Sequence, residues 1–382
     1  MQTLKRLPDV ALFLIAGVLL GPHVTGLLSI QPDSRFNQLA LTFGACYILF
    51  DGGAALRLRV LERTWITIVV LATIGVLITA AIVAVAAQQI LDIPLVVALL
   101  LASVIASTDP ATLIPVFQQV KVRERVAQTV MAESAFNDAT AAILTFAVLD
   151  AATGVRGFSF TSAATDFATQ VAFGLAVGLA LGYAAMLLIA HERWGFLWRY
   201  APLITLMAVA GAYLGAEGLH ASGFLAVFVF GIVIGNPEAL GFPMRTRDTA
   251  MFARFVTATS LVARILIFVL LGAQVDLTLV NEHLAGGAIV VAVLMLVARP
   301  ATVFACALPD LRARWTFKEM LFMCWTRETG VIPGALAGLL MGMNAPDAKL
   351  IASVTFIAIL ATILLQATTT RWLAGKLGLL EE

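Results

Sequence analysis

Charged residues are scarce in this sequence. Lys, Arg, Asp and Glu together make up 12% of the 382 residues, against about 25% in soluble domains. Hydrophobic residues make up 61%, and a soluble core cannot hide so much apolar surface. The composition therefore excludes a water-soluble protein and predicts an integral membrane protein. The formal net charge of +1 leaves no basic field of the kind that binds nucleic acid.

Cysteine is rare, and the common cofactor motifs are lacking. The three cysteines, Cys46, Cys306 and Cys324, are isolated within apolar runs, a pattern that supports neither a disulfide framework nor a zinc site. No Gly-rich phosphate-binding loop and no Cys/His cluster with metal-ligand spacing occurs in the sequence. We therefore expect a protein that is not an enzyme and that holds no resident cofactor.

Long apolar runs, in contrast, fill the chain from residue 8 to about residue 372. Because a transmembrane helix needs about 20 mostly apolar residues, we predict an all-α membrane protein with about twelve spans. The predicted spans are 8–28, 37–56, 64–90, 93–118, 126–150, 165–190, 201–219, 221–236, 251–274, 284–308, 318–341 and 347–372. The first span is too long for a cleavable signal peptide and carries Gly21-Pro22 where a small-residue cleavage site is needed.

The distribution of basic residues agrees with this topology. Cytoplasmic loops of membrane proteins carry an excess of Lys and Arg. With the N-terminus inside, 18 of the 24 basic residues lie in cytoplasmic segments and three on the opposite side. The remaining three, Arg264, Arg299 and Arg327, fall within spans. We predict a multi-pass protein in the lipid bilayer of the cell membrane, with both termini cytoplasmic.

Proline interrupts the fourth span. It reads Ser107-Thr108-Asp109-Pro110, and Pro115 follows. Proline removes a backbone donor and clashes with the preceding turn, so we expect the helix to break near Thr108. Broken backbone at membrane depth survives only where it is buried or lines a wet cavity. The freed carbonyls, the Thr108 hydroxyl and the Asp109 carboxylate are oxygen ligands that suit a small cation.

The fifth span carries a run of polar residues, Glu133-Ser134-Ala135-Phe136-Asn137-Asp138. Residues four apart share a helix face, so Ser134 lies over Asp138 and Glu133 lies over Asn137. The alternative reading is that these groups hold helices together. Two intramembrane acids, Asp109 and Asp138, favour a functional site instead, because ionisable groups in a span are costly and usually mark an ion pathway.

A second interruption falls in the other half of the chain. The eleventh span contains Thr326-Arg327-Glu328-Thr329-Gly330, followed by Pro333-Gly334. Two interrupted helices in corresponding positions are typical of an alternating-access transporter. Arg327 needs an acidic partner at this depth, which either Glu133 or Glu328 can supply. We expect a structural Glu133–Arg327 ion pair, and we expect Arg299 to pin the broken helices electrostatically.

These motifs resemble those of the NhaP-type sodium/proton exchangers, a family of the cation:proton antiporter superfamily, over nearly the whole chain. The motifs are Thr108-Asp109-Pro110, Glu133-Ser134 followed by Asn137-Asp138, and Arg327 with Gly330 three residues later. Supporting segments are Leu49-Phe50-Asp51-Gly52-Gly53, Ser222-Gly223-Phe224-Leu225-Ala226-Val227 and Leu270-Leu271-Gly272. Glu328 departs from the Gly-x-Arg-Gly pattern of many relatives.

The resemblance implies roles for the site residues. Asp138 is the carboxylate that binds either cation or proton, and Asp109 assists it through water. Ser134 and Thr108 complete the shell of the monovalent cation, and Glu133 pairs with Arg327. Glu328, which departs from the pattern of the relatives, adds a negative charge to the electrostatics of the core that either satisfies Arg327 locally or alters the ion preference. An Asn137-Asp138 pair, where relatives carry two acids, implies electroneutral exchange of one cation for one proton.

The resemblance also implies an inverted-repeat elevator fold with two broken, crossing helices, assembled as a homodimer. On this basis, residues 64–150 and 284–382 form a mobile core bundle. Residues 1–63 and 200–283 form the dimerisation bundle, and 151–199 form a connector helix.

The predicted function is therefore antiport of a monovalent cation for a proton, with the two competing at Asp138. Alternatives are a cation channel or an organic-anion symporter that shares the inverted-repeat fold. Paired broken helices favour a carrier over a channel, and an acidic site argues against an anion. Oxygen ligands accept Na⁺, K⁺ and Li⁺ alike, so the residues leave the identity of the ion open.

Overall fold

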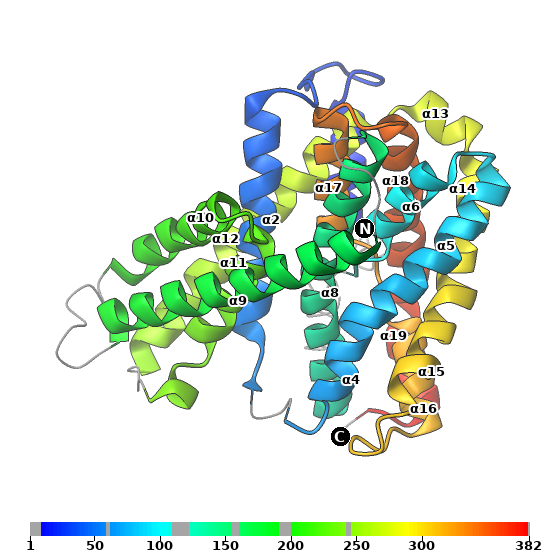
Figure 1. Ribbon diagram of the computed structural model, residues 1–382. Coiled ribbons are helices and arrows are strands. Elements are labelled where there is room, and N and C mark those ends of the chain that lie inside the picture. Colours follow the sequence, from blue (N-terminus) through cyan, green and yellow to red (C-terminus); the bar gives the residue numbers. More distant parts are fainter. Residues whose placement is uncertain are drawn as a thin grey trace, which may run out of the picture. The chain divides into compact units, whose positions relative to one another are not determined.

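In the computed structural model, residues 9–58, 62–108, 122–154, 160–190, 200–241 and 246–380 are described. Regular structure in these ranges is helical throughout (Figure 1), apart from one isolated bridge between Val122 and Leu380. Seven helices of this part of the chain are long and apolar enough to cross a membrane, and four shorter apolar helices accompany them. The prediction of an all-α membrane protein is confirmed at this level, and at least one helix overlaps each of the twelve predicted segments.

The chain divides into two compact units. Unit 1 comprises Met1–Thr42, Leu61–Gly157 and Ile265–Glu382, and unit 2 comprises Phe43–Val60 and Phe158–Arg264. This division differs from the predicted bundles, because residues 9–42 and 265–283 pack within unit 1 and the predicted connector packs within unit 2. Chain order alone did not indicate these groupings, since helix α2 and helix α12 each contribute to both units. The assignment of a mobile and a dimerising bundle stays a prediction.

Unit 1 is built largely from long helices that contain a π-helical turn and from shorter helices that end at a break. Its elements are α1 (Asp9–Leu20), α4 (Trp65–Val70), η2 (Leu71–Gly75), α5 (Val76–Leu91), α6 (Leu95–Ile105), α8 (Glu124–Ala152), α13 (Leu277–Glu282), α14 (Leu284–Val293), η5 (Leu294–Ala298), α15 (Arg299–Ala307), α16 (Phe317–Trp325), α17 (Val331–Gly342), α18 (Ala348–Thr362), η6 (Ile363–Ala367) and α19 (Thr368–Leu377). Parts of α2 (Arg35–Ala55) and α12 (Thr246–Gln274) complete it.

Two of the π-helical turns lie where long helices cross. The turn η2 packs against α15, and the turn η5 packs against α5. The helices come close because Gly75 faces Thr302, whose methyl carbon would lie 2.8 Å from a Cβ at residue 75. The Thr79 and Thr302 hydroxyls share a hydrogen bond of 2.9 Å. This contact joins the first long helix of each predicted half.

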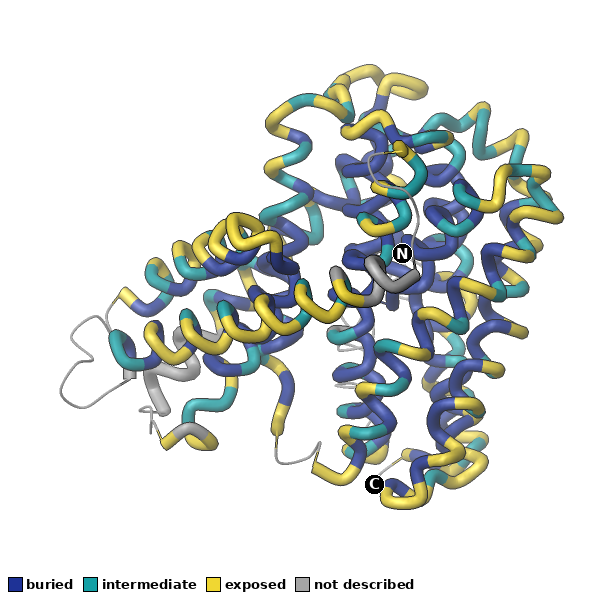
Figure 2. Tube along the Cα trace, in the orientation of Figure 1, coloured by how far each residue is buried: buried dark blue, intermediate teal, exposed yellow. Residues whose placement is uncertain are grey.

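Both predicted helix breaks coincide with the end of a helix. The helix α6 ends at Ile105, three residues before Thr108, and Asp109, Pro110 and Pro115 lie outside the described residues. The helix α16 ends at Trp325, residues 326–330 are not helical, and α17 begins at Val331. All twelve residues of α17 are buried (Figure 2). Residues 326–330 are buried as well, so the irregular backbone of the second break is enclosed by protein, as the absence of water in a bilayer requires.

Unit 2 is organised around a helix that is buried on nearly all sides. It contains α9 (Phe160–Ala190), α10 (Ala201–Gly218), α11 (Gly223–Gly235), a 3-10 turn η4 (Pro237–Leu240) and parts of α2 and α12. Helix α11 packs against α9 and α10 and meets α2 through glycines. A Cβ built on Gly231 would overlap with the carbonyl oxygen of Phe50, and one on Gly53 would overlap with that of Phe228. Small residues thus allow the two backbones to touch, as in many membrane helix pairs.

Substituting Gly231 by leucine is expected to destabilise unit 2. The added side chain must separate α11 from α2, and overpacking of this kind costs about 1–3 kcal/mol. Gly211→Leu in α10 is the matched control, because a Cβ at Gly211 meets nothing within 4 Å. Thermal unfolding of both variants in detergent should show a lowered midpoint for Gly231→Leu only. An unchanged midpoint for Gly231→Leu would refute the close helix contact.

Candidate functional site

The polar residues of α8 form a buried group in unit 1. Glu133, Ser134, Asn137 and Asp138 are each no more than 2% exposed. Their spacing places them on adjoining faces of one helix, as the sequence predicts. The faces lie against the end of α6, where Ser107 and Thr108 follow the last helical turn. Helix α8 therefore supplies most of the site, and the break after α6 supplies the remainder.

Asn137 and Thr108 bind one another reciprocally. The Thr108 backbone N–H donates to the Asn137 side-chain oxygen at 3.1 Å, and the Asn137 amide group donates to the Thr108 hydroxyl at 2.7 Å. The Thr108 and Ser134 hydroxyls share a further hydrogen bond of 2.7 Å. A buried backbone donor must find a partner, and Asn137 supplies it for Thr108 just beyond α6. The three predicted residues Thr108, Ser134 and Asn137 are thus brought together.

Asp138 lies beside this group and is 2% exposed. Its carboxylate accepts a hydrogen bond from the hydroxyl of Ser107. Ser107 was not among the predicted site residues, although it directly precedes Thr108 in the interrupted span. The sequence signal was present, because the chain leaves the helix at this point and both hydroxyls come free. Asp109 lies outside the described residues, so its predicted place beside Asp138 stays a prediction.

The predicted ion pair of Glu133 with Arg327 is corrected by the structure. Glu133 accepts two hydrogen bonds from the guanidinium group of Arg299, at 2.5 and 2.7 Å. Both side chains are 2% exposed. Arg299 also donates through Nε to the carbonyl oxygen of Met323 in α16 at 3.0 Å, which directs its remaining nitrogens toward α8. Arg299 therefore links α15, α16 and α8. Among the described residues of the two broken spans it contacts only α16, so its expected role of pinning both stays a prediction.

Arg327 has a different role. Its Nη2 donates to the carbonyl oxygens of Ala106 at 2.6 Å and Ile105 at 3.3 Å. The last carbonyls of a helix lack helical partners and carry a partial negative charge, so a cation there is favourable. Arg327 thereby joins the break after α16 to the end of α6. Glu328 is fully buried in the same segment, and its effect on the electrostatics stays a prediction.

The non-helical segment 326–330 and the end of α16 are held against α18 and α19 by two further hydrogen bonds. The Thr329 N–H donates to the hydroxyl of Thr362 at 3.0 Å. At the other end, the indole of Trp325 donates to the hydroxyl of Thr369 at 2.8 Å. The turn η6 lies between Thr362 and Thr369. One backbone N–H group released by the second break, that of Thr329, is thus satisfied by a side chain of the last span.

The chemistry of the site follows from its donor set. The end of α6 brings together the carboxylate of Asp138, the hydroxyls of Ser107, Thr108 and Ser134, and the amide oxygen of Asn137. No three His, Cys, Asp or Glu side chains come together among the described residues, so the grouping differs from the multi-carboxylate and imidazole sites of divalent metals. Hydroxyl, amide and single carboxylate oxygens suit a monovalent cation or a proton.

Residues 1–376 match the family model described as sodium/hydrogen exchanger, transmembrane. The chain belongs to the sodium/hydrogen exchanger family. The predicted resemblance is therefore confirmed, and with it the membership of a family of membrane antiporters.

Individual relatives support this assignment. Na(+)/H(+) antiporter 1 of Methanocaldococcus jannaschii is 33% identical, and the match covers 97% of this chain and 90% of that protein. K(+)/H(+) antiporter NhaP of Alkalimonas amylolytica is 29% identical, with 96% of this chain and 62% of that protein covered. The structure of the sodium proton antiporter MjNhaP1 from Methanocaldococcus jannaschii superposes with a TM-score of 0.83 at 30% identity, covering 98% of this chain and 94% of that chain.

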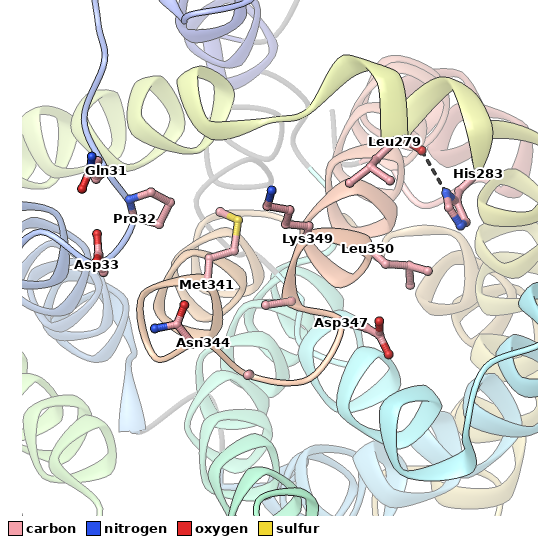
Figure 3. A pocket seen from close by; sticks show the side chains of 12 residues that line it. Gln31, Pro32, Asp33, Leu279, His283, Met341, Asn344, Asp347, Lys349 and Leu350 are labelled. Carbon is pink, nitrogen blue, oxygen red and sulfur yellow. Dashed lines mark hydrogen bonds between the residues drawn. The ribbon is translucent and has the colours of Figure 1, made fainter.

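A separate cavity of about 690 Å³ lies where α17 ends and α18 begins (Figure 3). Its lining mixes acidic groups, Asp33 and Asp347, with the basic Lys349. His283 also lines the cavity, and its ring is hydrogen-bonded to the carbonyl oxygen of Leu279 at 3.1 Å. None of the predicted site residues that the structure describes lines this cavity. In this member of the family, it is therefore distinct from the site on α8.

Proposed function

We propose that the protein is a secondary active antiporter that exchanges a monovalent cation for a proton at Asp138. The observation that carries the proposal is a buried carboxylate beside a helix end, surrounded by Ser107, Thr108, Ser134 and Asn137. The relatives are named as Na⁺/H⁺ and K⁺/H⁺ antiporters. Both names agree with an oxygen site whose ligands accept either ion, and Li⁺ is a third candidate.

Coupling follows from competition for one charge. A carboxylate enclosed by protein at membrane depth is costly as a lone anion, and either a cation or a proton neutralises it. The two cannot occupy it together without leaving a positive charge in the same low-dielectric space. Exchange of one for the other therefore moves one positive charge in each direction and is electroneutral. Glu133 is held by Arg299, which gives it a structural role in this scheme.

Alternating access completes the mechanism. We expect about twelve spans in an inverted repeat, of which residues 64–150 and 284–382 form the moving core. The order of elements supports this expectation, because each segment begins with a long helix that has a π-helical turn and continues with a helix that ends at a break. Arg327, bound to the end of α6, ties the two breaks together so that they can move as one body.

The proposal also covers the oligomeric state, the membrane and the orientation of the protein. We expect a homodimer in the cell membrane, with both termini cytoplasmic, and a structural rather than transporting role for the cysteines, all three of which are buried. The alternatives of a cation channel or an organic-anion symporter receive no support from the named relatives, which are antiporters.

Purified protein in sealed vesicles provides the test. Vesicles with an acidic interior and a pH-sensitive dye are diluted into choline chloride, and NaCl, KCl or LiCl is then titrated. We expect dye dequenching that saturates with at least one alkali cation and is absent in protein-free vesicles, because a carrier has a finite number of sites. A lack of response to all three cations, or a response that rises without saturation as in a channel, would rule out the proposed function.

A further inference from the structure

Three arginines converge on a cavity at one end of unit 1, away from the residues that bind the cation. The cavity has a volume of about 420 Å³ and is lined by Arg123, Glu124, Arg125, Arg314, Thr316 and Glu319. Arg123 and Arg125 belong to the start of α8, and the other basic residue lies in the loop that precedes α16. The start of α8, the helix that carries Asp138, therefore meets the loop before α16 at this cavity.

Positive charge is in excess around this cavity. Glu319 is 1% exposed. Its carboxylate accepts two hydrogen bonds from the guanidinium group of Arg125, at 2.9 and 2.5 Å. It also accepts hydrogen bonds from the backbone N–H and the hydroxyl of Thr316, at 2.9 Å each. Its charge is thus balanced by Arg125. Arg123 lies 3.6 Å from the same carboxylate but remains 48% exposed. Arg314 is exposed as well, and so is Glu124. The two positive charges of Arg123 and Arg314 and the negative charge of Glu124 leave a net charge of +1 that is available to an anion.

The walls of the cavity are held in place before any ligand binds. Asp310 anchors the loop by accepting from the Thr67 hydroxyl at 2.5 Å and from the N–H groups of Arg312 and Ala313 at 3.1 Å each. Burial alone would raise the pKa of Asp310, but these hydrogen bonds outweigh it and lower the pKa below its ordinary value. The Arg125 guanidinium lies 4.7 Å from the centre of the Trp315 ring.

Exposed apolar side chains lie on the loop before α16 and at the start of that helix. Leu311 is 83% exposed and Phe317 is 66% exposed, and the ring of Phe317 stacks on Phe304 with the centres 5.8 Å apart. Arg312 and Lys318 are exposed on the same loop and helix start. Aromatic and apolar residues mixed with Arg and Lys at the end of membrane helices are typical of the lipid headgroup region.

We propose that this cavity binds the phosphate headgroup of an anionic phospholipid. Arg123 and Arg314 supply the hydrogen bonds and charge, because guanidinium groups match phosphate oxygens in geometry. Leu311 and Phe317 contact the acyl chains. Basic pockets between membrane helices commonly hold anionic headgroups, and the excess of positive charge here selects such a lipid over a neutral one.

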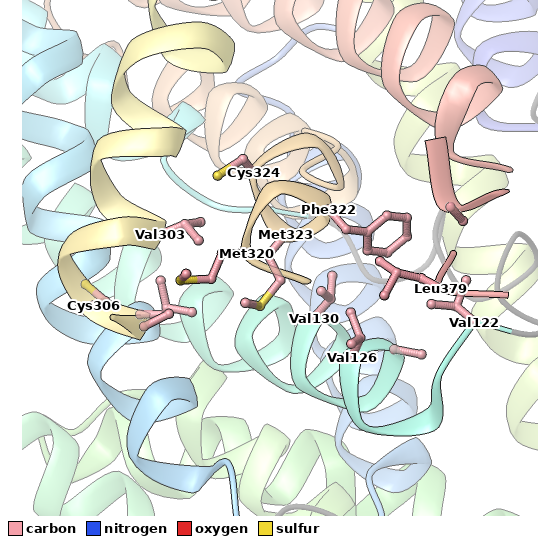
Figure 4. Packing of buried hydrophobic residues seen from close by; sticks show 14 residues of the cluster. Val122, Val126, Val130, Val303, Cys306, Met320, Phe322, Met323, Cys324 and Leu379 are labelled. Atoms are coloured by element: carbon pink, nitrogen blue, oxygen red, sulfur yellow. The ribbon is translucent and has the colours of Figure 1, made fainter. Parts of the chain in front are cut away.

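The bound lipid joins the start of α8 to the loop before α16. Below the cavity, these two helices share an apolar cluster that includes Val126, Val130, Met320 and Met323 (Figure 4). A headgroup that bridges Arg123 and Arg314 therefore reinforces a contact on which the alignment of the two helices depends. The bound lipid is expected to stabilise the folded protein, and this effect can be measured by unfolding, without a transport assay.

The test measures thermal unfolding of the full chain, purified in a neutral detergent, as phosphatidylglycerol or phosphatidylcholine is added. Phosphatidylglycerol is expected to raise the midpoint, and Arg123→Gln/Arg314→Gln is expected to require at least tenfold more of this lipid for the same shift. The control Arg35→Gln/Lys349→Gln removes two exposed positive charges elsewhere in unit 1 and should respond like the parent. The single variant Arg314→Gln, at an exposed position, should give an intermediate response even if the double variant does not fold.

Three results would overturn the proposal. The first is an equal shift with phosphatidylcholine, which would mean that the lipid acts as a bulk solvent. The second is an unchanged response of Arg314→Gln. The third is that inorganic phosphate at the same concentration reproduces the shift, which would make the cavity a site for the free ion. Since unfolding is measured without a cation gradient, these outcomes are independent of the transport assay.

Discussion

Asp138→Asn is expected to reduce cation-driven proton exchange to the level of protein-free vesicles. Asparagine keeps the size of the side chain but can neither lose a proton nor supply a negative charge. The hydroxyls of Ser107, Thr108 and Ser134 remain, yet neutral oxygens alone do not compensate the charge of a cation at membrane depth. The loss should therefore be complete for Na⁺, K⁺ and Li⁺, and raising the cation concentration should not restore exchange.

The control for this substitution lies on the same helix. Asp150 is exposed near the end of α8, so Asp150→Asn makes the same chemical change outside the site and should leave exchange close to the parent rate. Both variants are to be reconstituted at equal protein content and checked for an unchanged unfolding midpoint. Saturable exchange by a folded Asp138→Asn protein would show that another group carries the proton.

Glu133→Gln is expected to lower the free energy of unfolding by about 3–5 kcal/mol, because it leaves the buried Arg299 guanidinium without its counter-charge. Arg299→Gln should have a comparable effect, since it strands the Glu133 carboxylate. The double variant Glu133→Gln/Arg299→Gln should be less destabilised than the sum of the two, because it leaves no charge without a partner. Glu124→Gln, at an exposed position on the same helix, should change stability by no more than about 0.5 kcal/mol.

The same series distinguishes the two arginines. If Glu133 interacts chiefly with Arg299, a double-mutant cycle with Arg299→Gln will show a large coupling, and a cycle with Arg327→Gln will show a small one. Denaturant unfolding followed by tryptophan fluorescence in a mild detergent supplies the free energies. A stronger coupling to Arg327, or a Glu133→Gln protein as stable as the parent, would contradict the pairing in the structure.

Much of the site was predictable because it depends on local rules. Helical periodicity alone places Ser134 near Asp138 and Glu133 near Asn137 on adjoining faces, and proline alone predicts that the fourth span breaks near Thr108. One polar helix face and one break are then enough to bring Thr108, Ser134 and Asn137 together. The hydroxyl of Ser107 was overlooked because the site was expected to begin at the residue just before the Asp109-Pro110 pair.

The sequence by itself determined that the protein is helical, lies in a membrane and belongs to a family of cation/proton exchangers. Composition, the length of apolar runs and short motifs can be read from the order of residues along the chain. What they indicate does not depend on how the helices pack. The tertiary structure decided which arginine binds Glu133, what Arg327 does, and how the helices divide into two units. Arg299 and Arg327 are equally buried, and no local sequence pattern indicates which of them binds Glu133. Only the tertiary packing around α8 decides between the two arginines.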